Sequence, residues 1–313
     1  MKLPDQPDDR PPYSNRGVIP GPDTENIGEI EHAFDAYCAT VYAHPWPLLD
    51  HLEQALMDAG MNPSRSAGPP VRFYSENTLL LDPDGHRLLS VRAWGQNHHP
   101  FVECKGIASP VVAAVLREHF NHVPARLDVA VDRSGPDLMQ HLNALALQFE
   151  RERGVLLERA GADIDNVDRG STIYLGSRKS QSFLRVYQKG LQIAAEMNMR
   201  PEDIPDELRN WVRIEVELKP DKRPARQRAS TLDPHEVFGC SPWIRDFAKL
   251  ALSIDAKRVT MNERRETNHE RRMRYLTQQY GPTILEQVNR LGSWEAFAED
   301  LQARLGVGLQ EAA

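Results

Sequence analysis

Short runs in which apolar and polar residues alternate recur along the first 220 residues, and longer runs with helical spacing follow residue 241. Alternate side chains of a strand point to opposite faces of a sheet, so each alternating run predicts a strand with one apolar and one polar face. The strands predicted in this way lie within or near 29–43, 71–81, 87–105, 126–132, 154–159, 171–176, 182–189 and 211–219.

Helical spacing of apolar residues predicts helices between and after these strands. Ser109 followed by Pro110 favours a helix start, because serine caps a helix N-terminus and proline fits the first turn. The predicted helices cover 48–59, 109–120, 136–153, 242–255, 261–279, 282–291 and 294–304. We therefore predict an α+β fold, with a mainly antiparallel central sheet flanked by helices and a helical C-terminal region after it.

Changes in composition divide the chain into four predicted parts. Residues 1–28 are rich in Pro, Asp and Gly with little apolar content, which is typical of a disordered or loosely packed arm. Residues 29–220 form the predicted sheet domain, which the chemistry below assigns as catalytic. Residues 221–240 form a basic linker, and 241–313 form the helical C-terminal region.

Composition and cysteine usage limit the class of protein. A hydrophobic content of 40% over 313 residues can build a core, and no apolar run is long enough to predict a membrane span. The polar, Pro-rich N-terminus predicts no signal peptide. The three widely spaced cysteines argue against a disulfide framework and against a zinc site built on paired cysteines. We therefore expect a cytoplasmic protein.

The charge is acidic overall but basic in two segments. A net charge of −7 does not suit a protein that coats DNA non-specifically. Five basic residues lie within 219–228 and seven within 257–274. Each segment is a candidate phosphate-binding surface, and a solvated helix of mixed charge is the alternative interpretation of the second.

The strand predicted over 182–189 carries the most distinctive chemistry. Leu184 and Val186 face one way, and Arg185, Tyr187 and Lys189 face the other. Cations on both sides of a tyrosine favour the phenolate over the phenol and attract a phosphodiester, so we expect a lowered pKa at Tyr187. From the pattern alone, a tyrosine that only packs on a half-exposed strand remains the alternative.

Three other predicted strands carry carboxylates opposite their apolar residues. These are Asp128 with Asp132, Glu215 with Glu217, and Glu103. Charged residues are ordinary on a wet sheet face, but carboxylates on several strands of one sheet would form an acidic pocket suited to Mg²⁺ or Mn²⁺. Asp128 and Asp132 are roughly 13 Å apart along a strand, so at most one of them is a direct ligand of a given ion.

The order of four segments, 126–132, 172–180, 183–189 and 211–219, resembles the trans-acting rolling-circle replication initiators of small plasmids and filamentous phages. Relatives of that family act as relaxases of conjugative elements. The resemblance covers roughly residues 29–300. It implies a nicking-joining enzyme whose domain is similar in outline to the His-hydrophobic-His nucleases but lacks their histidine motif.

The resemblance also implies roles for individual residues. Tyr187 would be the nucleophile that forms a 5′-phosphotyrosine and leaves a 3′-OH primer, and Arg185 and Lys189 would contact the phosphates. Asp128 and Glu103 match the metal site best by position, and Glu215 and Asp132 are further candidates for holding Mg²⁺ or Mn²⁺. The remaining DNA-binding candidates are Arg178, Lys179, Arg213, Lys219, Lys222 and Arg223.

Several alternatives stay open at this point. The implied partners are origin DNA, single-stranded or in a hairpin, with a host helicase, a host polymerase and a second copy of the chain, and no membrane. A relaxase would use the same chemistry, a non-catalytic module would bind nucleic acid without cleaving it, and a metal nuclease would use water. Tyr174 is the second candidate for the nucleophile.

Overall fold

The structure is a computed structural model, and it describes residues 32–164, 169–261 and 268–306. The predicted arm over 1–28 lies outside the described residues. The chain divides into two compact units, Met1–Met261 and Asn262–Ala313. In the part of the chain that is described, every helix is too short or too polar to cross a membrane.

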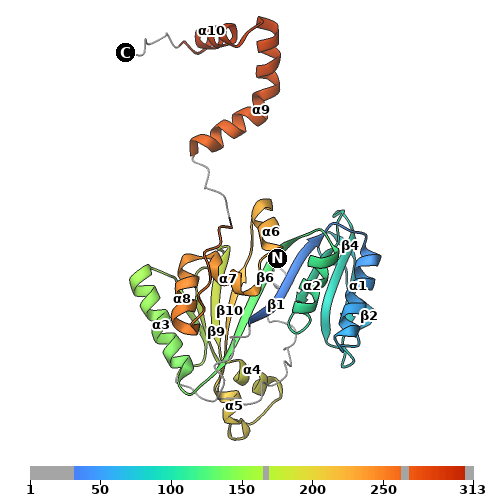
Figure 1. Ribbon diagram of the computed structural model, residues 1–313, viewed down its shortest axis with the longest axis vertical. Helices are drawn as coiled ribbons and strands as arrows, with labels where there is room; N and C mark the ends of the chain where they lie inside the picture. Colours follow the sequence, from blue (N-terminus) through green and yellow to red (C-terminus); the bar gives the residue numbers. More distant parts are fainter. Residues whose placement is uncertain (1–31, 165–168, 262–267, 307–313) are drawn as a thin grey trace, which may run out of the picture. The chain divides into compact units, whose positions relative to one another are not determined.

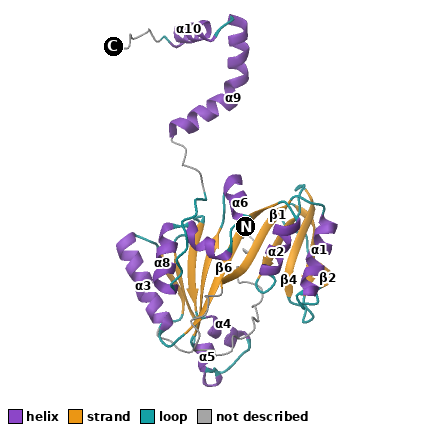
Figure 2. Ribbon diagram, viewed as in Figure 1, coloured by secondary structure: helices purple, strands orange, loops and turns teal. Residues whose placement is uncertain are grey.

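The described part of the first unit is built on a ten-stranded sheet with the order β2-β3-β4-β5-β1-β6-β10-β9-β8-β7 (Figures 1 and 2). Neighbouring strands pair antiparallel throughout, which confirms the predicted α+β fold with an antiparallel sheet. The strands are β1 His32–Val41, β2 Ser64–Ala67, β3 Tyr74–Leu81, β4 Arg87–Gly95, β5 Phe101–Lys105, β6 His122–Ser134, β7 Leu157–Gly161, β8 Ser171–Leu175, β9 Ser182–Tyr187 and β10 Trp211–Leu218.

The four helices predicted in the first unit form close to their predicted spans, but four further helices over 189–196, 206–209, 223–229 and 234–237 were not predicted. In the second unit, the helix predicted over 294–304 is confirmed. The single helix α9 replaces the two predicted over 261–279 and 282–291 and contains Pro282. The helices are α1 Pro45–Asp58, α2 Ser109–His119, α3 Leu138–Arg153, α4 Lys189–Glu196, α5 Asp206–Arg209, α6 Arg223–Ala229, α7 Pro234–Val237, α8 Pro242–Leu252, α9 Asn268–Leu291 and α10 Trp294–Leu305, with 3-10 turns at Pro201–Asp203 and Phe238–Cys240.

The predicted capping role of Ser109 is wrong. Ala108 is the N-cap residue, and the Ser109 hydroxyl donates to the backbone oxygen of Asp35.

One face of the sheet carries the core. Its alternate residues, such as Val129 of β6 and Val216 of β10, are fully buried in a cluster with apolar side chains of α1, α2, α3, α6, α7 and α8. The segment 221–240, for which composition suggests a linker, contributes Ala225 and Phe238 to this same cluster. That segment therefore packs as part of the sheet unit, and the division between the two compact units falls after Met261.

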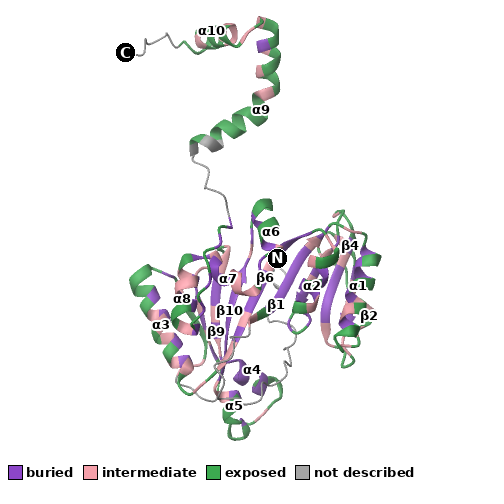
Figure 3. Ribbon diagram, in the orientation of Figure 1, coloured by how far each residue is buried: buried purple, intermediate pink, exposed green. Residues whose placement is uncertain are grey.

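The opposite face, here called the polar face, carries Asp128, Glu215 and Tyr187. Every residue of β10 is buried, so both faces of this central strand are shielded from water (Figure 3). Charged side chains on its polar face must therefore be paired or neutralised, because isolated buried charges are costly. The ion pairs of the candidate site, described below, meet this requirement.

A small second core closes one end of the polar face. Leu191 of α4 and Leu208 of α5 pack with Trp211 at the start of β10. Gly190 allows this approach, because a Cβ at that position would lie 1.9 Å from the backbone oxygen of Leu208. The side-chain oxygen of Gln188 accepts hydrogen bonds from the backbone NH and the hydroxyl of Ser171, which fixes the turn from β9 into α4.

Candidate active site

The strand register brings residues of β6, β10 and β9 together in rows on the polar face. In one row, Arg213 of β10 pairs with Asp132 of β6 and with Tyr187 of β9. In the next row, Glu215 of β10 lies opposite Arg185 of β9. Cross-strand neighbours on one face contact each other. The predicted nucleophile therefore shares one area with two predicted cations and two predicted carboxylates.

Tyr187 is half-buried, and the guanidinium carbon of Arg185 lies 5.5 Å from its ring centroid. Burial raises the pKa of the Tyr187 phenol above its ordinary value, and the carboxylate of Glu215 raises it further. Arg213 and Arg185 lower the same pKa but do not offset burial. The prediction of a lowered pKa at Tyr187 is therefore wrong, because burial was not visible in the strand pattern.

Lys189 does not flank Tyr187 on the strand, contrary to the prediction. β9 ends at Tyr187, and Lys189 is the first residue of α4. Its side chain is buried, and burial followed by the charge of Arg213 lowers the pKa of the Lys189 ammonium. Asp35 and Asp132 partly oppose this shift. Lys189 thus belongs to the electrostatic environment of the Tyr187 end of the polar face, although it comes from a helix.

Arg213 is held by two carboxylates. Its Nε and Nη2 donate to the two carboxylate oxygens of Asp132 at 2.7 and 2.6 Å, and its Nη1 donates to Asp35 Oδ1 at 2.8 Å. Arg213 is itself buried. This side chain therefore ties β10 to β6 and β1, and both Arg213 and Asp132 are already partnered. The sequence pattern did not identify Asp35 as a site residue, because it did not show which residues of the first strand face the core and which face the polar side.

The carboxylate cluster, defined as Asp128, Glu215 and Glu217, lies in the middle of the polar face. Asp128 and Glu217 are cross-strand partners that share Arg126, whose Nε donates to Asp128 Oδ1 at 2.8 Å and whose Nη2 lies 2.8 Å from Glu217 Oε2. Lys219 pairs with Glu217 from its other side. The three acids thus have strongly basic neighbours, and Arg126 is a site residue that sequence reasoning passed over.

Glu215 is the least satisfied member of this cluster. One of its oxygens accepts from Arg185, and the other, Oε2, is buried and has no hydrogen-bond partner among the described residues. Burial raises the pKa of Glu215 to about 8, Arg185 opposes the rise, and the charges of Asp128 and Asp35 add to it. A cation or a proton beside Oε2 would neutralise the buried negative charge of Glu215.

Glu103 does not join the cluster. It pairs with Arg92 and lies 3.6 Å from Arg87 on the β4 side. Strand β1 separates it from β6, where its row contains Cys38 and then Arg126. Two strand spacings, about 10 Å, therefore lie between Glu103 and the strand of Asp128. The two residues that matched the metal site best by position are not brought together.

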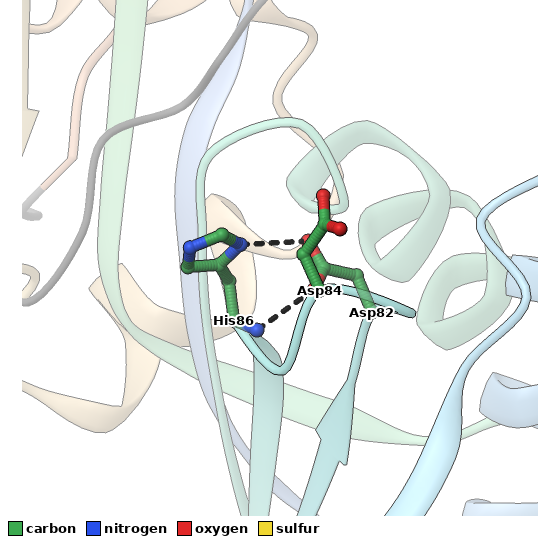
Figure 4. Close-up of side chains that lie close together, drawn as sticks. All are labelled: Asp82, Asp84 and His86. Atoms are coloured by element: carbon green, nitrogen blue, oxygen red, sulfur yellow. Dashed lines mark hydrogen bonds and ion pairs between the residues drawn. The ribbon is translucent and has the colours of Figure 1, made fainter. Parts of the chain in front are cut away.

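Within residues 32–164, 169–261 and 268–306, the polar face holds no group of three ligand atoms that lie within 4.8 Å of one another. Among the described residues, Asp82, Asp84 and His86 each offer one ligand atom within 4.8 Å of the other two, in the turn between β3 and β4 (Figure 4). Asp82 Oδ1 accepts from the backbone NH of His86 at 2.7 Å, and its Oδ2 lies 3.3 Å from His86 Nδ1. These contacts are those of a capped hairpin turn, which accounts for the grouping.

The DNA-binding candidates other than Arg213 lie on two segments. Arg178 and Lys179 are exposed in the loop between β8 and β9, and Lys222 and Arg223 are exposed at the start of α6. Lys219 Nζ donates to the backbone oxygen of Arg178 at 3.4 Å, which links the two segments. Together they form a basic edge next to the polar face.

Comparisons with known proteins identify the part of the chain that carries this site. Residues 125–229 match the family model described as replication initiation factor. That segment runs from β6 to α6 and contains the nucleophile candidate, the carboxylate cluster and the basic edge. The match confirms the resemblance that the order of the sequence segments suggested. Asp35 and Glu103 lie outside it.

Among solved structures, the chain is similar to a rolling circle replication initiator protein from Geobacillus stearothermophilus. The identity is 16% and the TM-score is 0.47, and the alignment covers 74% of this chain and 99% of that chain. A search of curated proteins gives no match.

Proposed function

We propose that this chain, a member of the replication initiation factor family through residues 125–229, nicks and rejoins one strand of origin DNA with Tyr187 as the nucleophile. The observation that carries the proposal is the position of Tyr187 in the matched segment. It lies on the polar face beside Arg185 and Arg213, one row from Glu215. A phosphate at Tyr187 would meet positive charge and the carboxylate cluster at once.

The chemistry balances as a transesterification. The phenol oxygen of Tyr187 forms a bond to the scissile phosphorus, and the bond from phosphorus to the 3′ oxygen breaks. The phenol proton leaves to solvent, and the 3′ oxygen takes up a proton to become a free 3′-OH that can prime a polymerase. The phosphotyrosine keeps the bond energy, so a later 3′-OH can attack it and reseal the strand.

The carboxylate cluster offers the oxygen ligands that Mg²⁺ and Mn²⁺ prefer, although its ligand atoms are less closely grouped than those of Asp82, Asp84 and His86. Among the described residues, Glu215 Oε2 is a buried acceptor without a hydrogen-bond partner. Glu215, Asp128 and Glu217 would hold the ion. When bound, such an ion would supply Lewis-acid stabilisation of charge on the phosphate. Glu103, placed two strands away, is not part of this proposed set.

The same arrangement explains how a tyrosine with a raised pKa can react. The anionic form of Glu215 raises the pKa of Tyr187, whereas Arg213 and Arg185 lower it. A cation beside Glu215 would neutralise its charge and add to the two arginines in opposing burial, which is the largest cause of the raised pKa of Tyr187. We infer that Tyr187 becomes nucleophilic only when positive charge is present in the carboxylate cluster.

The test compares wild type with Tyr187→Phe on the labelled, supercoiled replicon that encodes the chain, with Mg²⁺ or Mn²⁺. We expect a covalent DNA–protein band from wild type and from Tyr174→Phe, and none from Tyr187→Phe. Cleavage that survives in Tyr187→Phe would point to water or Tyr174 as the nucleophile. Binding of this DNA without cleavage by wild type would support the non-catalytic module.

The partners of such an initiator remain part of the proposal. Origin DNA in a single-stranded or hairpin form suits a half-buried tyrosine, since an unpaired strand can bring its phosphate to the phenol more easily than a duplex can. A host helicase, a polymerase and a second copy of the chain would act with it. A relaxase would use the same chemistry, and the match to replication initiation factors favours the initiator.

A further inference from the structure

We propose that Tyr174 and Arg178 form a stacking subsite for one unpaired base of the DNA strand that enters the site. This proposal rests on the proposed function, because it assigns the base next to the phosphate that Tyr187 attacks. It gives Tyr174 a binding role in place of the role of second nucleophile.

The two tyrosines are close neighbours on adjacent strands. Tyr174 of β8 lies directly opposite Arg185 of β9, and Tyr187 lies opposite Thr172. Tyr174 is therefore a diagonal neighbour of Tyr187 on the same face, about 7–8 Å away. A base attached to a nucleotide at Tyr187 can reach that distance without crossing another strand.

Arg178 and Tyr174 already form a stacked pair. The guanidinium carbon of Arg178 lies 4.2 Å from the Tyr174 ring centroid, closer than Arg185 lies to the ring of Tyr187. Arg178 is exposed, and within the described part of the chain its guanidinium has neither an ion pair nor a hydrogen bond. Bases stack on aromatic rings and on the guanidinium plane of arginine. An unpaired base can extend this stack or take the place of Arg178 on the ring.

A second aromatic residue, Phe183, lies beside the Tyr174 ring. The Phe183 ring centroid lies 6.3 Å from that of Tyr174, with 35° between the planes, and Lys219 Nζ lies 5.8 Å from the Phe183 centroid. Phe183 is buried on the polar face and is not a member of the apolar core cluster. The Tyr174 ring thus rests on a fixed neighbour, which reduces the entropy lost when a base stacks on it.

The surrounding charge suits a nucleic-acid strand better than an apolar peptide. Arg178 and Lys179 are exposed in the loop that follows Tyr174, and Lys222 and Arg223 are exposed in the segment after Lys219, whose Nζ donates to the backbone oxygen of Arg178. Asp221 is the one acid within 219–228. Phosphates of a single strand would follow these cations while its base occupies the stack.

The test measures binding of a fluorescein-labelled 12-nucleotide oligothymidylate by anisotropy, in EDTA so that no cleavage occurs. We expect Tyr174→Leu to weaken binding by about 5- to 150-fold, the range for one lost base–aromatic stack. Tyr174→Phe keeps the ring and should bind like wild type. Arg178→Ala should weaken binding, whereas Arg151→Ala, an exposed arginine of α3 on the helix-covered side, should not.

A second probe isolates the stack from the phosphate contacts. An oligonucleotide of the same length with abasic sites keeps every phosphate but offers no ring. Wild type should bind it more weakly than oligothymidylate, and Tyr174→Leu should bind the two probes alike. Equal weakening of both probes by Tyr174→Leu, or an unchanged affinity with a normal unfolding curve, would overturn the subsite.

The nicking assay keeps this proposal separate from the proposed function. Normal nicking with no affinity loss in Tyr174→Leu would overturn the subsite alone. Stacking-dependent binding without any nicking by wild type would support the subsite and overturn the nickase. Loss of nicking in Tyr174→Phe, which keeps the ring, would overturn the binding role and make Tyr174 the nucleophile.

Discussion

Glu215 and Arg185 face each other across β10 and β9, and their ion pair leaves Glu215 Oε2 buried, with no hydrogen-bond partner in the described part of the chain. This half-satisfied carboxylate lies one row from Tyr187 and raises the pKa of its phenol. The pair therefore links the acid–base state of the carboxylate cluster to the reactivity of the tyrosine.

The first prediction concerns pH and stability. The folded protein holds the pKa of Glu215 at about 8, against an ordinary value of 4.5, so it binds a proton that the unfolded chain has released. The free energy of unfolding should therefore fall as pH rises from about 4.5 to about 8, by about 1.4 kcal/mol per pH unit for one proton. Urea unfolding in EDTA at several pH values measures this slope.

Glu215→Gln is the matched variant for this prediction. It should lose the Glu215 contribution to the slope, so its stability should depend less on pH between 5 and 8. Added Mg²⁺ or Mn²⁺ at pH 8 should stabilise wild type more than Glu215→Gln. A slope that is the same in both proteins would contradict the assignment of the raised pKa to Glu215.

The second prediction tests whether Asp128, and not Glu103, is a ligand of the proposed divalent cation. Asp128→Asn should abolish metal-dependent nicking and keep DNA binding, because it removes a charged oxygen ligand but keeps a similar shape. Glu103→Gln should nick like wild type, because Glu103 lies across β1 and pairs with Arg92. Nicking and binding assays on the same DNA check both. A severe nicking defect in Glu103→Gln would restore the original pairing of Glu103 with Asp128.

The third prediction concerns Arg213 as a structural tie. Arg213→Ala should reduce the free energy of unfolding by about 2–3 kcal/mol, because it removes the guanidinium that both Asp132 and Asp35 contact. The loss stays below that of a fully buried pair since both acids are partly exposed. Urea denaturation measures it, and the exposed Arg151→Ala is the control. A loss below about 0.5 kcal/mol, within the range of ordinary surface substitutions, would mean that the tie contributes little.

The fourth prediction concerns the packing of α4 on α5. Gly190→Ala should destabilise the protein by about 1–3 kcal/mol or more, because the added Cβ overlaps the backbone oxygen of Leu208. Gly135→Ala is the control, since its Cβ would meet only Leu138 Cβ at 3.9 Å. The shift of α4 should also move Lys189 and reduce nicking. Equal stability of the two variants would show that α4 can move away at no cost.

The strand pattern correctly predicted which face of the sheet carries each of the main candidate site residues. The apolar alternation of 126–132 and 211–219 gave the correct faces for Asp128, Glu215 and Glu217, because side chains of a strand alternate whatever its neighbours are. The match over residues 125–229 agrees with the family that the ordered segments suggested. Tyr187 was placed on the polar face for the same reason.

The end of β9 was not predictable from alternation. Lys189 continues the pattern of Arg185 and Tyr187, yet Gln188 turns the chain by accepting two hydrogen bonds from Ser171, a residue distant in sequence. The apolar residues after Lys189 then pack on Trp211 as a helix. A tertiary contact, and not a local preference, decided where the strand stops.

The sequence by itself determined which side chains share a face, because that depends only on the two-residue period of a strand. The tertiary structure decided which strands are neighbours, and so which charges meet. It put β1 between Glu103 and Asp128, brought Asp35 to Arg213, and buried Tyr187 and Glu215 deeply enough that desolvation outweighs the nearby arginines. Strand order and burial arise from contacts between distant segments, and no local pattern encodes them.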